Sequence, residues 1–119
     1  MNSVFNSVCP LLETDNGIFH RNVAALEIAR TVIAECIAVA RTQGISLTAS
    51  EVEESLLKIS KLSDGQLIST YQDILAGRRT EIDTLNFEIV RMAGNVNVSN
   101  TKLLGELVRL KADMSGGII

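Results

Sequence analysis

Aromatic side chains are scarce in this sequence: they make up 3% of 119 residues, and tryptophan is absent. Hydrophobic residues nonetheless account for 46% of the chain, so any core must be mainly aliphatic. A single proline and few stretches of alternating apolar and polar residues count against strands. These scarcities favour an all-α fold, a multi-helix bundle that forms one domain over residues 1–119.

Two further absences limit the classes of partner. The net charge of -3 lacks the basic footprint that nucleic-acid-binding proteins usually show. No apolar run is long enough to cross a bilayer, and the N-terminus lacks the basic residues that begin a signal peptide. We therefore expect a protein that binds neither nucleic acid nor membranes.

Cysteine is limited to Cys9 and Cys36, too few for a disulfide framework. Interpreted as small buried thiols in a reducing compartment, they predict a cytoplasmic protein; a disulfide between them is the alternative. His20 stands apart from any cluster with metal-ligand spacing, so we expect no metal site. The sequence also has no glycine-rich phosphate loop after a strand. We therefore do not expect this chain by itself to bind a nucleotide in the way that doubly wound α/β domains do.

Apolar spacing and capping signals predict six helices. Three of them span Asn2–Leu12, Arg21–Gln43 and Glu81–Ala93. A fourth is opened by a capping box at Thr48–Glu51, and a fifth is opened by a second box at Ser63–Gln66 and ended by Gly77. The last helix is capped by Ser99 or Asn100. The helix opened at Thr48 is expected to bury Val52, Leu56, Ile59 and Leu62, and the one opened at Ser63 to bury Leu67, Ile68, Tyr71, Ile74 and Leu75. The helix over residues 81–93 is expected to bury Ile82, Leu85, Ile89 and Met92, and the last helix Leu103, Leu104, Leu107, Val108 and Leu110.

The predicted helix over residues 21–43 is the most apolar, which makes it the expected central helix. At 100° per residue, its charged residues Arg21, Glu27, Arg30, Glu35 and Arg41 share about half the circumference. The other half is wide, apolar and rich in alanine. We expect part of that face to lie against a second domain or a second copy of the chain, which predicts a homodimer.

The most distinctive stretch, Ser69 to Asp83, reads S-x-x-Q-D-x-x-A-G-R-x-T-E-I-D. Gly77 suits the left-handed position after a helix, and Thr80 can cap a new helix with Glu81 in its first turn. Local rules do not account for the paired arginines at positions 78 and 79, which stand beside Glu81 at a turn.

This pattern resembles the C-terminal domain of the ketopantoate reductase (2-dehydropantoate 2-reductase) family. Asn2 and Asn6, followed by Asn16-Gly17, look like the family's N-x-x-x-N … N-G segment. Ala40-x-x-x-Gly44-Ile45 resembles the end of its long helix, and Asn100-Thr-Lys-Leu the start of its final one. The resemblance implies a helical bundle like the C-terminal-like domain of 6-phosphogluconate dehydrogenase.

The resemblance also implies a function. The family reduces the ketone of 2-dehydropantoate to D-pantoate with NADPH, on the route to coenzyme A. An N-terminal dinucleotide-binding domain holds the cofactor, and the helical domain supplies most of the site for this small 2-keto acid. Carried over, Asn2, Asn6 and Asn16 would hydrogen-bond the hydroxyl and carboxylate region of the substrate, and Ser69 its carboxylate end. Glu81 would lie near the nicotinamide ribose and the catalytic lysine.

That lysine, the family's proton donor, stands four residues before the first of these asparagines and so would precede Met1. We therefore expect no catalytic residue, no dinucleotide-binding domain and no bound NADPH in this chain alone, which would be inactive as a reductase. The sequence also departs from the family pattern at Phe87, where a glycine is usual, and at Ser99, where a proline is usual. Whether the chain is an enzyme stays open; the alternative is a free-standing helical dimerisation or binding module.

Overall fold

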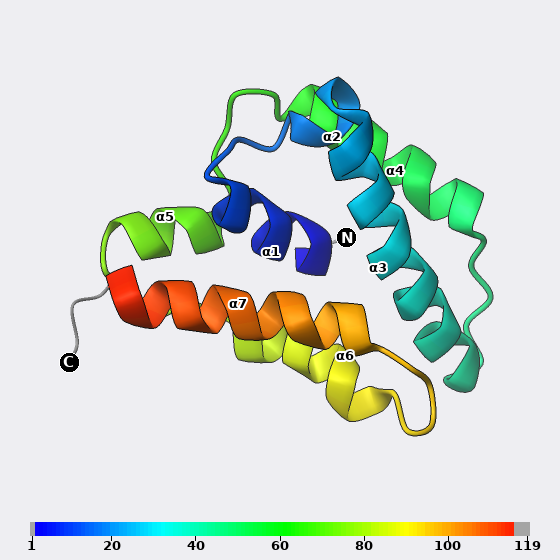
Figure 1. Cartoon of the computed structure of the whole chain (residues 1–119). Coiled ribbons are helices and arrows are strands. Elements are labelled where there is room, and N and C mark those ends of the chain that lie inside the picture. The colour runs from blue at the N-terminus through cyan, green and yellow to red at the C-terminus, as the bar shows by residue number, and fades with distance from the viewer. Residues whose placement is uncertain (1, 116–119) are drawn as a thin grey trace.

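The computed structural model describes residues 2–115, which form helices and loops and no strand (Figure 1). The prediction of an all-α fold is therefore confirmed. None of the helices in this part of the chain is sufficiently long and apolar to cross a bilayer. The elements are α1 (Asn2–Leu12), α2 (Ile18–Arg21), α3 (Val23–Thr42), α4 (Ala49–Leu62), α5 (Ser69–Leu75), the 3-10 helix η1 (Ile82–Thr84), α6 (Asn86–Met92) and α7 (Ser99–Ser115).

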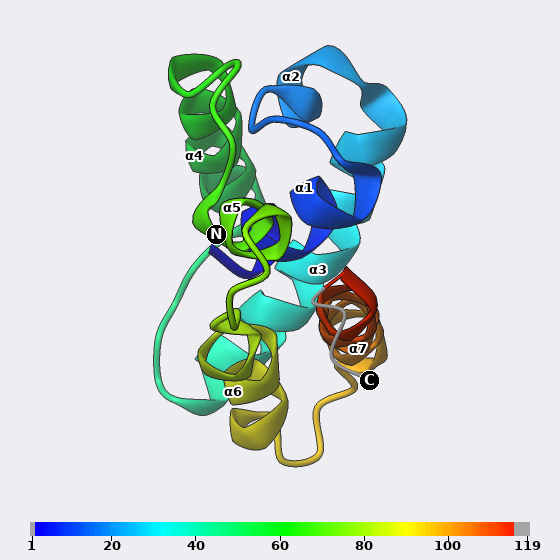
Figure 2. The same cartoon turned by 90° about the vertical axis from the view of Figure 1, so that its left-hand side faces the viewer.

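Helix α1 lies inside the bundle (Figures 1 and 2). All residues from Ser3 to Pro10 are buried, and α1 contacts α3, α5, η1 and α7. The helix continues through Pro10 to Leu12, so the proline does not break it. A helix that is buried on all sides belongs to the core, and α1, rather than the helix predicted over residues 21–43, holds that position.

Helix caps explain several boundaries. Helix α3 begins at Val23 and not at Arg21, because the side chain of Asn22 caps it by accepting a hydrogen bond from the Ala25 N–H at 3.1 Å. Thr48 caps α4 as predicted and accepts from the Glu51 N–H at 3.2 Å. Gly77 has a φ of +70°, the left-handed conformation predicted for it after α5.

Two predicted helix starts are wrong. Ser63 ends α4 instead of opening the next helix, because its hydroxyl donates to the Ile59 carbonyl at 2.6 Å. The helix predicted over residues 81–93 is divided into η1 and α6 by Leu85, whose φ of -110° and ψ of -93° lie outside the helical region. Glu81, not Thr80, precedes η1, and its side chain makes no capping hydrogen bond.

Fewer apolar residues are buried in the core than predicted. Its largest cluster joins α1 and α2 to α3 and to Leu56 of α4; smaller clusters lie beside α6 and between α5, η1 and α7. Helices on the outside of the bundle bury only part of their apolar residues, so several predicted core positions are wrong. Those more than a third exposed are Ile59, Leu62, Leu67, Leu75, Met92, Leu103, Leu107 and Leu110.

Glu35 was predicted on the charged half of its helix, yet it is only 9% exposed. Its carboxylate accepts hydrogen bonds from the Thr101 N–H at 2.7 Å, the Thr101 hydroxyl at 2.7 Å and the Asn100 N–H at 3.1 Å. Burial acts to raise the pKa of Glu35, but hydrogen bonds from Thr101 and Asn100 outweigh it and hold that pKa below its ordinary value. A carboxylate on α3 thus caps the first turn of α7.

Replacing this carboxylate tests the cap. Glu35→Ala should lower the free energy of unfolding at pH 7 by about 2–3 kcal/mol, because buried donors lose a charged acceptor. The folded-state pKa is depressed, so this stabilisation is present above the unfolded pKa of about 4.3 and is lost as pH falls through the folded value. Urea unfolding of both proteins from pH 7 down to pH 2 measures the difference.

The exposed Glu27 on the same helix is the matched control. Glu27→Ala should change stability by less than about 0.5 kcal/mol. A Glu35→Ala effect that persists undiminished at pH 2 would contradict the assigned role of the carboxylate charge.

Candidate functional site

Asn6 joins α1 to the start of α5. Its side-chain oxygen accepts from the Thr70 hydroxyl at 2.5 Å and the Thr70 N–H at 3.3 Å, and the Ser69 hydroxyl lies 3.4 Å away. Its amide nitrogen donates to the Asn2 carbonyl at 2.8 Å. The structure thus brings two predicted site residues, Asn6 and Ser69, together, whereas Asn2 contributes its backbone carbonyl from one turn earlier on α1.

These three residues differ in which hydrogen-bonding groups they leave free for a ligand. Asn6 is 5% exposed and uses its oxygen and one amide N–H inside the protein, which leaves one N–H for another partner. Asn2 and Ser69 are exposed. Thr70, 1% exposed, contributes most to the junction and was missed by the sequence analysis. Its position after Ser69 was visible, but its partner Asn6 lies 64 residues away.

A hollow of about 390 Å³ opens beside Asn2. It lies where α1 meets α3, η1 and α6, and its lining includes Asn2, Cys36 and Glu88. Burial raises the pKa of the Cys36 thiol, so this group is protonated at neutral pH. Apart from Glu88, the lining is therefore uncharged.

Asn16 lies in the turn between α1 and α2. Its backbone N–H donates to the Gln66 carbonyl at 2.9 Å, and its carbonyl accepts from the Ser60 hydroxyl at 2.7 Å. Its side-chain oxygen is buried and has no hydrogen-bond partner among residues 2–115. The turn therefore lies against the loop that leads to Ser69, although Asn16 forms no hydrogen bond with Asn6 or Ser69.

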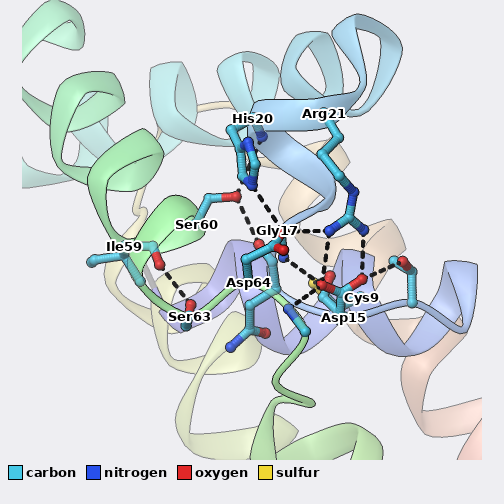
Figure 3. Close-up of polar contacts among 12 residues, drawn as sticks. Cys9, Asp15, Gly17, His20, Arg21, Ile59, Ser60, Ser63 and Asp64 are labelled. Carbon is cyan, nitrogen blue, oxygen red and sulfur yellow. Dashed lines mark hydrogen bonds and ion pairs between the residues drawn. The ribbon is translucent and has the colours of Figure 1, made fainter.

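A cluster of charged side chains holds these two loops together (Figure 3). The Asp15 carboxylate accepts from the Arg21 guanidinium at 2.5 Å and from the backbone N–H groups of Gly17 at 3.2 Å and Gly65 at 2.6 Å. The hydrogen bonds from Arg21 hold the pKa of Asp15 well below its usual range. Arg21 also donates to Asp64 at 2.5 Å, which links the turn after α1 to the loop after α4.

His20 belongs to the same cluster. Its ring nitrogen Nε2 lies 2.9 Å from Asp64, and its backbone N–H donates to the Ser60 hydroxyl at 3.3 Å (Figure 3). The hydrogen bond with His20 lowers the pKa of Asp64. Among residues 2–115, no three His, Cys, Asp or Glu side chains are grouped in a way that could hold a metal ion. His20 therefore supports the loop structure.

Glu81 lies apart from the asparagines. It is exposed and precedes η1, which contacts α1. No hydrogen bond within the described chain joins Glu81 to Asn2, Asn6 or Ser69. Of the two arginines that precede Glu81, Arg78 pairs locally with Asp73 at 3.2 Å. Asp83, two residues after Glu81, pairs with Arg109 from α7.

The junction offers amide and hydroxyl groups and no titratable side chain. Such groups fix a ligand by direction, and they suit hydroxyl and carboxylate partners. A nicotinamide cofactor fits only in part: the exposed Glu81 carboxylate can accept from ribose hydroxyls, but the described residues contain no strand–turn–helix for a pyrophosphate. The arrangement can position a small polar substrate.

Comparison with known proteins gives a consistent picture. The profile of the family described as "Ketopantoate reductase PanE/ApbA C terminal" matches residues 1–112. The chain is 34% identical, over 119 residues, to the 2-dehydropantoate 2-reductase of Pyrococcus horikoshii, covering 98% of this chain and 39% of that protein. It therefore spans about two fifths of the curated relative that it matches.

Two solved structures share the fold. A PanE/ApbA family ketopantoate reductase from Ralstonia eutropha JMP134 superposes with a TM-score of 0.85 at 34% identity, over 96% of this chain and 39% of that one. The ternary structure of D-mandelate dehydrogenase with NADH and anilino(oxo)acetate gives a TM-score of 0.89 at 27% identity, over 96% of this chain and 49% of that one. The chain belongs to the ketopantoate reductase family and corresponds to its C-terminal domain.

Proposed function

We propose that residues 1–119 form one helical domain, the substrate-binding part of an NADPH-dependent 2-dehydropantoate 2-reductase-like oxidoreductase. The reaction is reduction of the ketone of 2-dehydropantoate to D-pantoate in pantothenate and coenzyme A biosynthesis. One observation carries the proposal: the buried Asn6 ties α1 to Thr70 and to the exposed Ser69 at the start of α5, in a chain of this family.

The proposed role of each residue follows from the hydrogen-bonding groups that its side chain does not use within the protein. Asn2 and Ser69 offer exposed polar groups to the hydroxyl and carboxylate of the substrate. Asn6 offers its remaining N–H. Asn16 is the fourth proposed substrate residue, and its side-chain oxygen is buried without a hydrogen-bond partner among residues 2–115. Glu81 accepts hydrogen bonds from the nicotinamide ribose.

Proton transfer needs a group that the junction does not supply. Hydride arrival places negative charge on the ketone oxygen, which requires a proton donor beside it. Amides and hydroxyls cannot fill that role at neutral pH. In the family a lysine does so, and we expect the 119 residues alone to be inactive as a reductase.

A second candidate is reduction of another small 2-keto acid with NADH. The observation that favours it is the superposition on D-mandelate dehydrogenase, whose structure holds NADH and anilino(oxo)acetate. The polar junction fits the carboxylate and ketone common to all such acids.

We further propose a cytoplasmic homodimer. The free thiols of Cys9 and Cys36 suit a reducing compartment, and burial, with a smaller contribution from Asp15, raises the pKa of Cys9 to about 12. In the alternative function, the chain acts as a free-standing dimerisation or binding module, which the exposed apolar side chains of α7 favour.

The isolated chain tests the first part of the proposal. The 119-residue protein should show no oxidation of NADPH with 2-dehydropantoate above the rate without protein, because the junction has no titratable proton donor and residues 2–115 contain no strand–turn–helix for a pyrophosphate. Absorbance at the reduced nicotinamide band measures this directly. Turnover by the pure chain would refute the claim of inactivity.

A hybrid enzyme tests substrate binding. We would join the dinucleotide-binding part of the Pyrococcus horikoshii relative to this chain and expect NADPH-dependent reduction of 2-dehydropantoate. Ser69→Ala in the hybrid should raise KM about tenfold, since a hydrogen bond to a carboxylate is lost. Ser55→Ala, at an exposed serine of α4, is the matched control and should leave KM unchanged.

The hybrid also separates the candidates. Faster turnover of a different 2-keto acid would favour the second candidate. A hybrid that folds and binds NADPH but reduces no 2-keto acid would favour the binding module.

A further inference from the structure

The paired arginines at positions 78 and 79 line a hollow of about 360 Å³ in the loop between α5 and η1. The rest of its lining comes from η1 and from the second half of α7, a helix that contacts both α5 and η1 (Figure 1). We call it the arginine hollow; its polar lining residues are Arg78, Arg79, Thr80, Asp83, Arg109 and Asp113. The lining contains none of the residues proposed to bind substrate or cofactor.

The fold accounts fully for only one of the three guanidinium groups. Arg109 pairs with Asp83, and its guanidinium carbon lies 4.0 Å from the centre of the Phe87 ring. Arg78 donates from Nε to Asp73 at 3.2 Å, and its two terminal nitrogens form no hydrogen bond within residues 2–115. A guanidinium carries five N–H donors in a planar fork. Most donors of Arg78 are therefore open to a ligand.

Arg79 is open to a ligand to a greater extent. It is exposed, and its side chain forms neither an ion pair nor a hydrogen bond with any residue in the described part of the chain. Thr80, which follows it, is half-buried in the lining, and its hydroxyl likewise has no partner among residues 2–115. Two guanidinium groups and one hydroxyl thus offer donors to the same hollow.

The shape of this donor set favours a phosphate group. A carboxylate has two oxygens and can engage one guanidinium fork at both of them, which would leave the second fork without an acceptor. A phosphate monoester has three strong acceptor oxygens and carries more negative charge. It can therefore accept from Arg78, Arg79 and Thr80 at once. Arginine suits this role because its fork matches the geometry of phosphate oxygens.

Two carboxylates limit which phosphate compound fits. Asp83 is paired with Arg109, whereas the exposed Asp113 forms no ion pair within the described residues. Three arginines and two aspartates give the hollow a formal charge of +1. Inorganic phosphate would be attracted by the arginines but repelled by Asp113. A ligand that also carries hydroxyl groups can donate to this carboxylate, because an ionised carboxylate only accepts hydrogen bonds.

We infer that the arginine hollow binds a small phosphorylated polyol of the sugar phosphate class. Arg78 and Arg79 hold its phosphate, Thr80 donates a further hydrogen bond to it, and Asp113 accepts from its hydroxyl groups. The inference does not depend on the reductase proposal, since it uses no residue of the α1–α5 junction.

An NMR titration of the ¹⁵N-labelled 119-residue chain at constant ionic strength tests the site. The Nε–H signals of Arg78 and Arg79 should shift and saturate with inorganic phosphate and, at lower concentration, with glucose 6-phosphate, whereas glucose should shift neither. Arg79→Gln should raise Kd for both phosphates at least about tenfold, because charge-assisted hydrogen bonds are lost. The matched control is Arg41→Gln at an exposed arginine of α3, which should leave both Kd values unchanged. The backbone amide spectrum verifies that each variant is folded.

Asp113→Ala tests the role of the carboxylate. It should strengthen the binding of inorganic phosphate, because a repulsive charge is removed, and abolish the preference for glucose 6-phosphate. A wild-type chain whose Arg79 signal does not saturate with either phosphate would overturn the inference. Equal losses in the variants at positions 41 and 79, or an unchanged preference in Asp113→Ala, would overturn it as well.

Discussion

Burial of α1 on all sides is the constraint on which the rest of the structure depends. A polar side chain on a buried helix must find hydrogen-bond partners within the protein. Asn6 finds them in Thr70 and in the Asn2 carbonyl, and the Ser7 hydroxyl donates to the Ser3 carbonyl at 2.5 Å. The bonds of Asn6 fix the start of α5, with the exposed Ser69, against α1, one turn after the exposed Asn2.

Rigid support elsewhere keeps this junction in place. The Asp15, Arg21 and Asp64 cluster ties the turn after α1 to the loop before α5. The Glu35 carboxylate ties α3 to the first turn of α7. Charges thus hold the scaffold, while the proposed substrate groups are neutral amides and hydroxyls. This division suits a domain that orients a substrate and leaves proton transfer to a group supplied from elsewhere.

Local sequence rules predicted what depends on neighbouring residues. The all-α fold, α1, the Thr48 cap and the left-handed Gly77 needed no long-range information. The resemblance to the family indicated Asn6 and Ser69, which the structure brings together. Glu35 looked like a surface carboxylate because its partners lie 65 and 66 residues along the chain. The exposed face of α7 was mistaken for core because apolar spacing alone does not reveal which apolar stripe of a helix is covered.

The most direct test of the α1–α5 junction as a substrate site is an NMR titration of the ¹⁵N-labelled chain with 2-dehydropantoate. If the site is as described, the backbone amides of Ser69 and Thr70 and the side-chain amides of Asn2 and Asn6 will shift together and saturate along one binding curve. Binding without the nucleotide domain should be weak, in the millimolar range of Kd or above. Saturable shifts confined to another part of the chain, or no shift at these groups up to the solubility limit of the acid, would contradict the assignment.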